Sequence, residues 1–135
     1  MAHYILDEKG EVKEVDDLLV WGKWFQENGD KRVIARTEVG DYFVSTVFLG
    51  LDYNFARNFA GLTGGEDRTP ILFETMVFEN ELTTVTVFGK TRERHKELDL
   101  DGTMDRYHTK EEAIKGHTEM VKLVEKIQKE KPKNE

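Results

Sequence analysis

The sequence predicts an α+β domain with a mainly antiparallel sheet of about five strands and two main helices packed on one face. Three observations predict this fold. Several β-rich runs are joined by short turns, and two segments, within residues 18–25 and 113–127, repeat apolar residues every three or four positions. Few helical segments lie between the β-rich runs, so successive strands should pair as antiparallel neighbours.

The strands are predicted from apolar and β-branched runs bounded by turn residues. The central hairpin joins residues 32–39 to residues 42–49 through the two-residue turn Gly40-Asp41. The remaining predicted strands are residues 3–6, 11–15, 71–78, 83–88 and 104–108. Turns are predicted at residues 7–10, 79–81 and 99–102. Residues 89–96 can extend the strand of residues 83–88.

Both predicted helices begin at residues that can cap them. Asp16 or Asp17 can accept hydrogen bonds from the free amides of the first helix, which ends before Gly29. In the last helix, Thr109 and Glu112 form a capping box, in which each side chain bonds to the other residue's free amide. The apolar residues are Leu18, Leu19, Trp21, Trp24 and Phe25 in the first helix and Ala113, Ile114, His117, Met120, Val121, Leu123, Val124 and Ile127 in the last.

The length of 135 residues is typical of one domain, and the sequence has no internal repeat or low-complexity linker. We therefore expect a single α+β domain over residues 1–128. Residues 129–135 are polar and include a proline, so we expect them to form a disordered tail.

The composition excludes several classes of function. With 20 basic and 27 acidic residues the net charge is −7, which argues against a nucleic-acid partner bound through a broad basic face. The absence of cysteine excludes disulfides, thiol nucleophiles and zinc sites built from cysteine. No apolar run approaches the ~18 residues of a membrane span, and no signal-like segment opens the sequence. We expect a cytoplasmic protein with no membrane association.

Several strings, taken together, resemble a group of small uncharacterised proteins encoded by phages and prophages. The matches run in order over most of residues 3–125 and include Val44-Ser-Thr-Val-Phe-Leu-Gly-Leu-Asp52, Leu72-Phe-Glu-Thr-Met-Val-Phe78, Asp105-Arg-Tyr-His-Thr109, Glu111-Glu-Ala113, Gly116-His117 and His3-Tyr-Ile-Leu-Asp7 with Trp21 and Trp24-Phe25. The resemblance implies an origin in a phage or mobile element, and hence a bacterial host, but no activity. Residues 79–100 stand where the group has a short turn, so this sequence has an insertion of about a hairpin's length.

Four side chains are candidates for an enzyme or metal site: Glu74, Asp52, His108 and His117. Glu74 could act as a general base if its neighbours raised its pKa, or it could be a solvent-facing residue of a strand. Asp52 could equally cap or turn the chain. His108 and His117 lie about two and a half helical turns apart, so one ion could not bind both without a bend. A partly buried His117, hydrogen-bonded to the backbone or to water, is the alternative.

An acidic turn carries the spacing of a calcium-binding loop. Glu97, Asp99 and Asp101 occupy alternate positions, and Gly102 is the sixth residue. However, the twelfth position is His108, where a bidentate glutamate is needed, and strands rather than helices are predicted on both sides. The sequence therefore favours a plain turn, and we predict no metal site, no cofactor and no catalytic residue.

Exposed aromatic residues give a further candidate, a protein-binding surface in the long connection between residues 50 and 70. Aromatic residues and arginine are enriched at interface hot spots, and this connection contains Tyr53, Phe55, Arg57 and Phe59. The alternative is that they fold back as a lid over the uncovered face of the sheet. The inserted strand, residues 83–88, could also present an edge to another chain.

The sequence thus leads to a non-enzymatic accessory protein that acts by binding a protein, for example a host or defence factor. Two alternatives stay open. One is a small enzyme or metal-binding protein that uses Glu74, Asp52, His108 or His117. The other is a homodimeric structural protein that associates through the long connection or the inserted hairpin.

Overall fold

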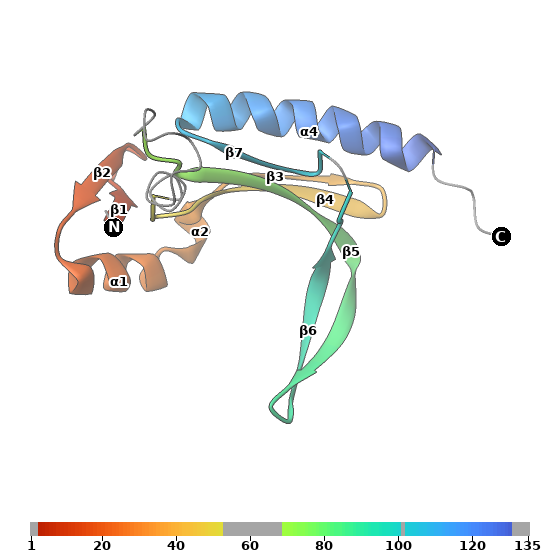
Figure 1. Cartoon of the computed structure of the whole chain (residues 1–135), viewed down its shortest axis with the longest axis horizontal. Helices are drawn as coiled ribbons and strands as arrows, with labels where there is room; N and C mark the ends of the chain where they lie inside the picture. The colour runs from red at the N-terminus through yellow and green to blue at the C-terminus, as the bar shows by residue number, and fades with distance from the viewer. Residues whose placement is uncertain (1–2, 53–68, 101, 131–135) are drawn as a thin grey trace, which may run out of the picture.

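The computed structural model describes residues 3–52, 69–100 and 102–130. Within these residues the chain forms a two-stranded sheet, a five-stranded sheet and three helices (Figure 1). The elements, in chain order, are β1 (His3–Leu6), β2 (Val12–Val15), α1 (Leu18–Glu27), α2 (Gly29–Arg32), β3 (Val33–Val39), β4 (Tyr42–Phe48), β5 (Phe73–Val87), β6 (Lys90–Glu97), β7 (Met104–Tyr107) and α4 (Lys110–Glu130).

The larger sheet is antiparallel throughout, as the sequence predicts. Its strand order is β3-β4-β5-β6, and β7 pairs with the first residues of β5. The predicted hairpin through Gly40-Asp41 is confirmed as β3 and β4, and Gly40 has a positive φ of 58°, a conformation that glycine adopts without strain.

Helix α4 covers one face of this sheet (Figure 1) and contacts β3, β4, β5 and β7. The predicted capping box is confirmed, because the Thr109 amide donates to Glu112 Oε1 at 3.0 Å and the Glu112 amide donates to Thr109 Oγ1 at 3.1 Å. One core cluster is formed between helix and sheet by Tyr42, Val44, Val77, Met120 and Val124. The helix ends at Glu130, two residues into the segment expected to be a tail, and residues 131–135 lie outside the described residues.

Helix α1 packs elsewhere, so the prediction that both main helices cover one face is not confirmed. Its contacts are with β1 and β2, and Figure 1 shows it on the side of the larger sheet away from α4. Asp17 caps it by accepting from the Leu19 and Val20 amides. The indole of Trp24 meets the ring of Phe48 edge-on, which joins α1 to the second core cluster of Leu6, Phe48, Leu72, Phe73 and Ala113.

Strand β5 differs from the prediction because it continues through the expected turn at residues 79–81. The register shifts between Phe78 and Leu82, where β5 has a bulge. Asn80 explains the shift, since its side chain donates to the carbonyls of Gly40 and Tyr42 and its amide donates to that of Asp41. These polar residues therefore bind the end of the β3–β4 hairpin instead of reversing the chain.

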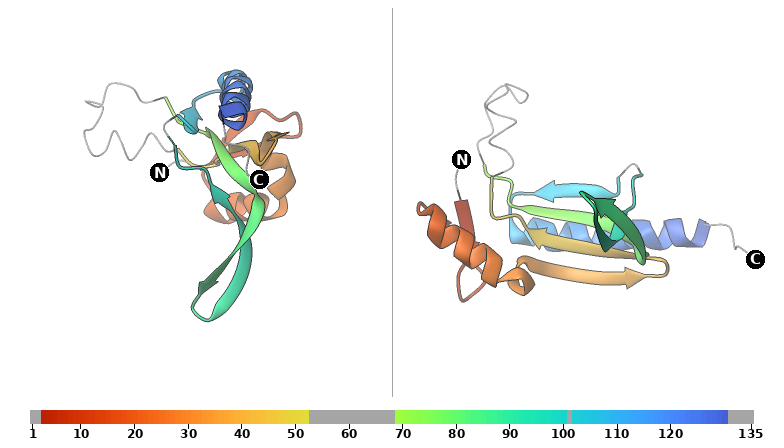
Figure 2. Two further views of the ribbon diagram at one scale, coloured as in Figure 1. Left: turned by 90° about the vertical axis from the view of Figure 1, so that its right-hand side faces the viewer. Right: turned by 90° about the horizontal axis from the view of Figure 1, so that it is seen from below.

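The chain reverses only at Phe88-Gly89, and β6 returns along β5, so the prediction that residues 89–96 extend the preceding strand is wrong. Residues 82–97 form a two-stranded hairpin that projects away from α4, which we call the arm (Figures 1 and 2). The segment that the resemblance implies to be an insertion is thus a β-hairpin that leaves the plane of the sheet.

Candidate functional site

Each of the four candidate catalytic residues has its own structural partner, and Asp52 and His108 contact neighbouring residues, Ile71 and Pro70. Glu74 forms an ion pair with Arg106 across β5 and β7, with 2.8 Å between Oε2 and Nε. Asp52 accepts a hydrogen bond from the Ile71 amide at 3.1 Å. Each carboxylate therefore has a contact within the fold, on a different part of it, and the two do not form a shared acid–base pair.

The two histidines also have separate structural partners. The ring of His108 contacts the Pro70 carbonyl through Nδ1 at 3.0 Å. His117 is buried beneath α4, where Nδ1 lies 2.7 Å from Thr46 Oγ1 and Nε2 lies 2.9 Å from Thr37 Oγ1. Its partners are thus threonine hydroxyls on the sheet, and burial lowers the pKa of its imidazole.

No metal centre is formed by the residues that the structure describes, since no three His, Asp or Glu side chains among them are grouped closely enough to hold an ion. Asp101, from the calcium-like turn, lies outside them. So do Tyr53, Phe55, Arg57 and Phe59, the predicted protein-binding residues. Among the described helices, none has both the length and the apolar character needed to cross a membrane.

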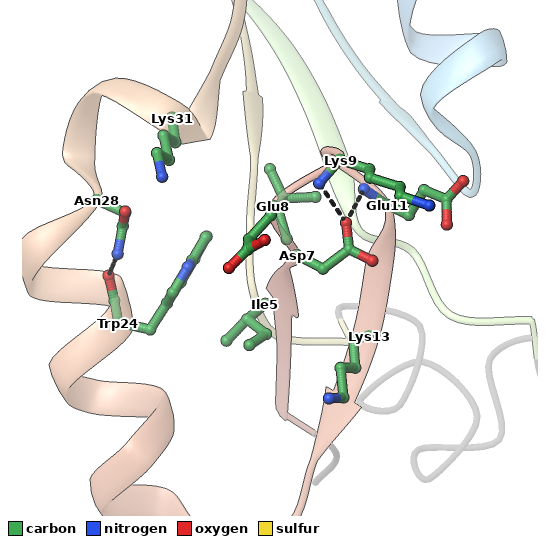
Figure 3. A pocket seen from close by; sticks show the side chains of 10 residues that line it. Ile5, Asp7, Glu8, Lys9, Glu11, Lys13, Trp24, Asn28 and Lys31 are labelled. Carbon is green, nitrogen blue, oxygen red and sulfur yellow. Dashed lines mark hydrogen bonds between the residues drawn. The ribbon is translucent and has the colours of Figure 1, made fainter.

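A hollow of about 560 Å³ lies between the β1–β2 turn and α1 (Figure 3). Trp24 forms one wall, and the charged residues around it are of both signs, with lysines 9, 13 and 31 beside acidic residues 7, 8 and 11. Asp7 is already engaged, because Oδ1 accepts from the Glu11 and Lys9 amides at 2.9 Å each, and the bond from Glu11 is the main reason that its pKa is lowered. The balanced charge gives this hollow no selectivity for one class of ion.

The arm is the more distinctive surface, and its root is held rigidly. Phe43 is 5% exposed and stacks on Phe78 with 5.1 Å between ring centroids. The ring of His95 meets the Phe43 ring edge-on, with 4.9 Å between centroids, and the guanidinium of Arg36 lies 4.0 Å from the Phe43 centroid. His95 Nδ1 also contacts the Glu79 carbonyl at 2.9 Å. These contacts fix the direction in which the arm leaves the sheet.

The distal half of β5 has a free edge. In the described part of the chain, β4 pairs with β5 only as far as Glu79, whereas Leu82 and the residues after it pair with β6 alone. Val87 and Lys90 flank a two-residue turn, so their backbones form a hydrogen-bonded pair. From this pair toward the sheet, residue pairs alternate between hydrogen-bonded and non-hydrogen-bonded. The N–H and C=O groups of Thr84 and Thr86 consequently point outward from the free edge.

The tip of the arm carries an unusual aromatic residue. Phe88 is 99% exposed and has a φ of 52°, in the left-handed region that costs a residue other than glycine about 1–2 kcal/mol. The following Gly89 also has a positive φ, as a type I′ turn requires. Asparagine is the usual residue at the first position, and neither burial nor backbone preference explains a phenylalanine there.

The sequence indicated an inserted hairpin but not its charge pattern, although a signal for that pattern is present. Residues 90–97 read Lys-Thr-Arg-Glu-Arg-His-Lys-Glu, with a basic residue at every second position. No protein-family model, curated protein or solved structure matches the chain.

Proposed function

We propose that the protein is a non-enzymatic protein-binding module that binds by strand addition at the free edge of the arm. The observation that carries this proposal is the unpaired edge of residues 82–87. Exposed edges are normally protected by charged residues, proline or a covering element. This segment reads Leu-Thr-Thr-Val-Thr-Val, which has high β-propensity and neither charge nor proline.

A second copy of the chain is the partner that fits this edge. Two copies of residues 82–87 paired antiparallel across a two-fold axis would place Thr and Val side chains opposite one another, without like charges. The outer edge of β6 is less suited, because its self-pairing would oppose the cations of one copy to those of the other. Origin in a phage or mobile element stays a prediction from the resemblance.

The chain offers a matched pair of variants for the test. Thr86 and Thr91 lie directly opposite each other in the hairpin, with 3.2 Å between their hydroxyls. Thr86→Pro removes an outward N–H from the free edge of β5, whereas Thr91→Pro removes one from the outer edge of β6. Both variants lose the same hydroxyl contact and keep the hydrogen bonds within the hairpin.

Sedimentation velocity over a micromolar concentration series gives the readout. We expect the wild type and Thr91→Pro to form dimers. Thr86→Pro should dimerise about tenfold more weakly or worse, since the two-fold axis doubles the loss of a hydrogen bond worth about 0.5–1.5 kcal/mol. A wild type that stays monomeric throughout the series, or equal weakening by both variants, would contradict the proposal.

A further inference from the structure

The cations of the arm lie on one of its two faces. Side chains alternate along a strand, so every second residue of β6 shares a face. Lys90, Arg92, Arg94 and Lys96 therefore form one face, which we call the basic face, and the face opposite carries Thr91, Glu93, His95 and Glu97. The two faces of β6 therefore differ in charge, with four cations and no acid among the β6 residues of the basic face.

The basic face points away from the body of the protein. His95 lies against Phe43 and Phe78, on the side of the sheet away from α4, so the residues that alternate with it lie on the other side. Because the arm bends away from α4, that other side becomes its outer face (Figures 1 and 2). The four cations are presented to an external molecule.

These cations form no ion pair in the described part of the chain, although they also disfavour self-pairing of the outer edge of β6. Two ion pairs occur there, Arg36–Glu38 and Arg106–Glu74, and neither involves the basic face. Four like charges at two-residue spacing repel one another, which weakens the hairpin. In a protein with a net charge of −7, such a cluster is best explained by an anionic ligand.

Three features of the outer face fit a nucleic acid, and the last of them favours it over an acidic protein. The cations repeat every ~6.8 Å along the strand, close to one nucleotide step of an extended backbone. A hollow of about 660 Å³ on the arm is lined by Val85, Val87, Phe88 and residues of the basic face, with Glu93 also in contact. The Phe88 ring, exposed at the tip beside Lys90, can stack on a base.

We infer that the basic face of the arm binds single-stranded nucleic acid, with Lys90, Arg92, Arg94 and Lys96 on successive phosphates and Phe88 stacked on an unpaired base. A single strand is favoured over a duplex because its bases stack on Phe88 without first being unstacked. The acidic net charge does not oppose this binding, since it is distributed over the body while the cations lie on a projection. The site goes beyond the proposed protein-binding edge, which uses the backbone of β5.

Fluorescence anisotropy with a labelled oligothymidylate tests the inference. The wild type should bind with a log–log salt slope of about −3, because about 0.7 counterions are released for each of four phosphates. Arg92→Gln with Arg94→Gln should weaken binding at low salt at least tenfold and reduce the slope by about half. Lys9→Gln with Lys13→Gln changes the net charge equally and should leave binding unchanged.

Phe88→Ala supplies the second readout. It should weaken binding to oligothymidylate at least fivefold and leave binding to an abasic strand of equal length unchanged. Four results would overturn the inference: no binding at low salt, equal loss in both charge variants, tighter binding of the matching duplex, or displacement by polyglutamate of the same charge as efficiently as by unlabelled oligothymidylate. The last result would assign the face to an acidic protein. The double variant Arg92→Gln, Arg94→Gln should still dimerise, because these changes leave the free edge of β5 intact. Sedimentation of this variant therefore separates a failure of nucleic-acid binding from a failure of strand addition.

Discussion

The two halves of β5 have similar β-propensity and opposite surroundings. Residues 73–79 pair with β4 on one side, residues 73–76 pair with β7 on the other, α4 lies across one face, and Phe73 and Val77 are 0% and 1% exposed. Residues 82–87 pair with β6 alone, and Val87 is 55% exposed. One strand therefore serves as core in its first half and as surface in its second.

The difference shows how one strand can continue from a buried sheet into an exposed hairpin. The first half is stabilised by apolar contacts with α4, whereas the second depends on β-propensity, on its turn and on its rigid root. Changes in the first half should therefore affect folding. Changes in the arm should affect binding and leave folding almost intact.

Val→Ala substitutions at two positions of the same strand test this division most directly. Val77→Ala removes buried methyl groups and leaves a cavity beside Val44 and Val124, so the free energy of unfolding should fall by about 2–3 kcal/mol. Val85→Ala, in the arm, should change it by about 0.5 kcal/mol or less. Urea denaturation of the two variants measures both values. Similar losses would show that the arm is part of the cooperative core.

The pH dependence of stability tests the polar contacts beneath α4. Burial lowers the pKa of His117 from its ordinary value of 6.5, so the folded state binds a proton less readily than the unfolded state. The contribution of neutral His117 to the free energy of unfolding should therefore be fully present above about pH 6.5. It should fall as the pH is lowered below that value. His117→Gln should remove this part of the pH dependence, as followed by urea denaturation between neutral and mildly acidic pH. An unchanged pH profile in the variant would exclude His117 as its source.

The smallest effect is expected at the tip of the arm. Phe88→Asn places a residue that tolerates positive φ at the first position of the type I′ turn, so stability should stay equal or rise by up to about 1 kcal/mol. Thermal denaturation measures this change. A clear loss of stability would show that the Phe88 ring supports the fold, and would remove the argument that it is kept for a ligand.

The local parts of this fold could be predicted from the sequence, and the non-local parts could not. The Thr109–Glu112 capping box and the Gly40-Asp41 hairpin depend on neighbouring residues, and both are confirmed. The turn predicted at residues 79–81 fails because Asn80 binds the end of a hairpin some forty residues earlier. The apolar stripe of α1 indicates burial but not which surface buries it.

The candidate site was the harder prediction for the same reason. The sequence predicted a partly buried His117 bonded to the backbone or to water; the structure buries it, and its partners are threonine hydroxyls of β3 and β4, far away in the sequence. The alternation of basic residues over 90–97 is visible in the sequence, whereas its place on a projecting hairpin depends on the register between β5 and β6.

The root of the arm gives the domain a modular architecture. Phe78 and Glu97 face each other as the last pair before the bulge, so the two ends of the arm leave the sheet within about 4.5–5.5 Å of each other. A short turn could close that gap and leave α4 and the strands beneath it unchanged. A longer or different hairpin could be accommodated equally well. The hairpin can therefore vary in length and sequence while the sheet that supports it and the core beneath α4 stay the same.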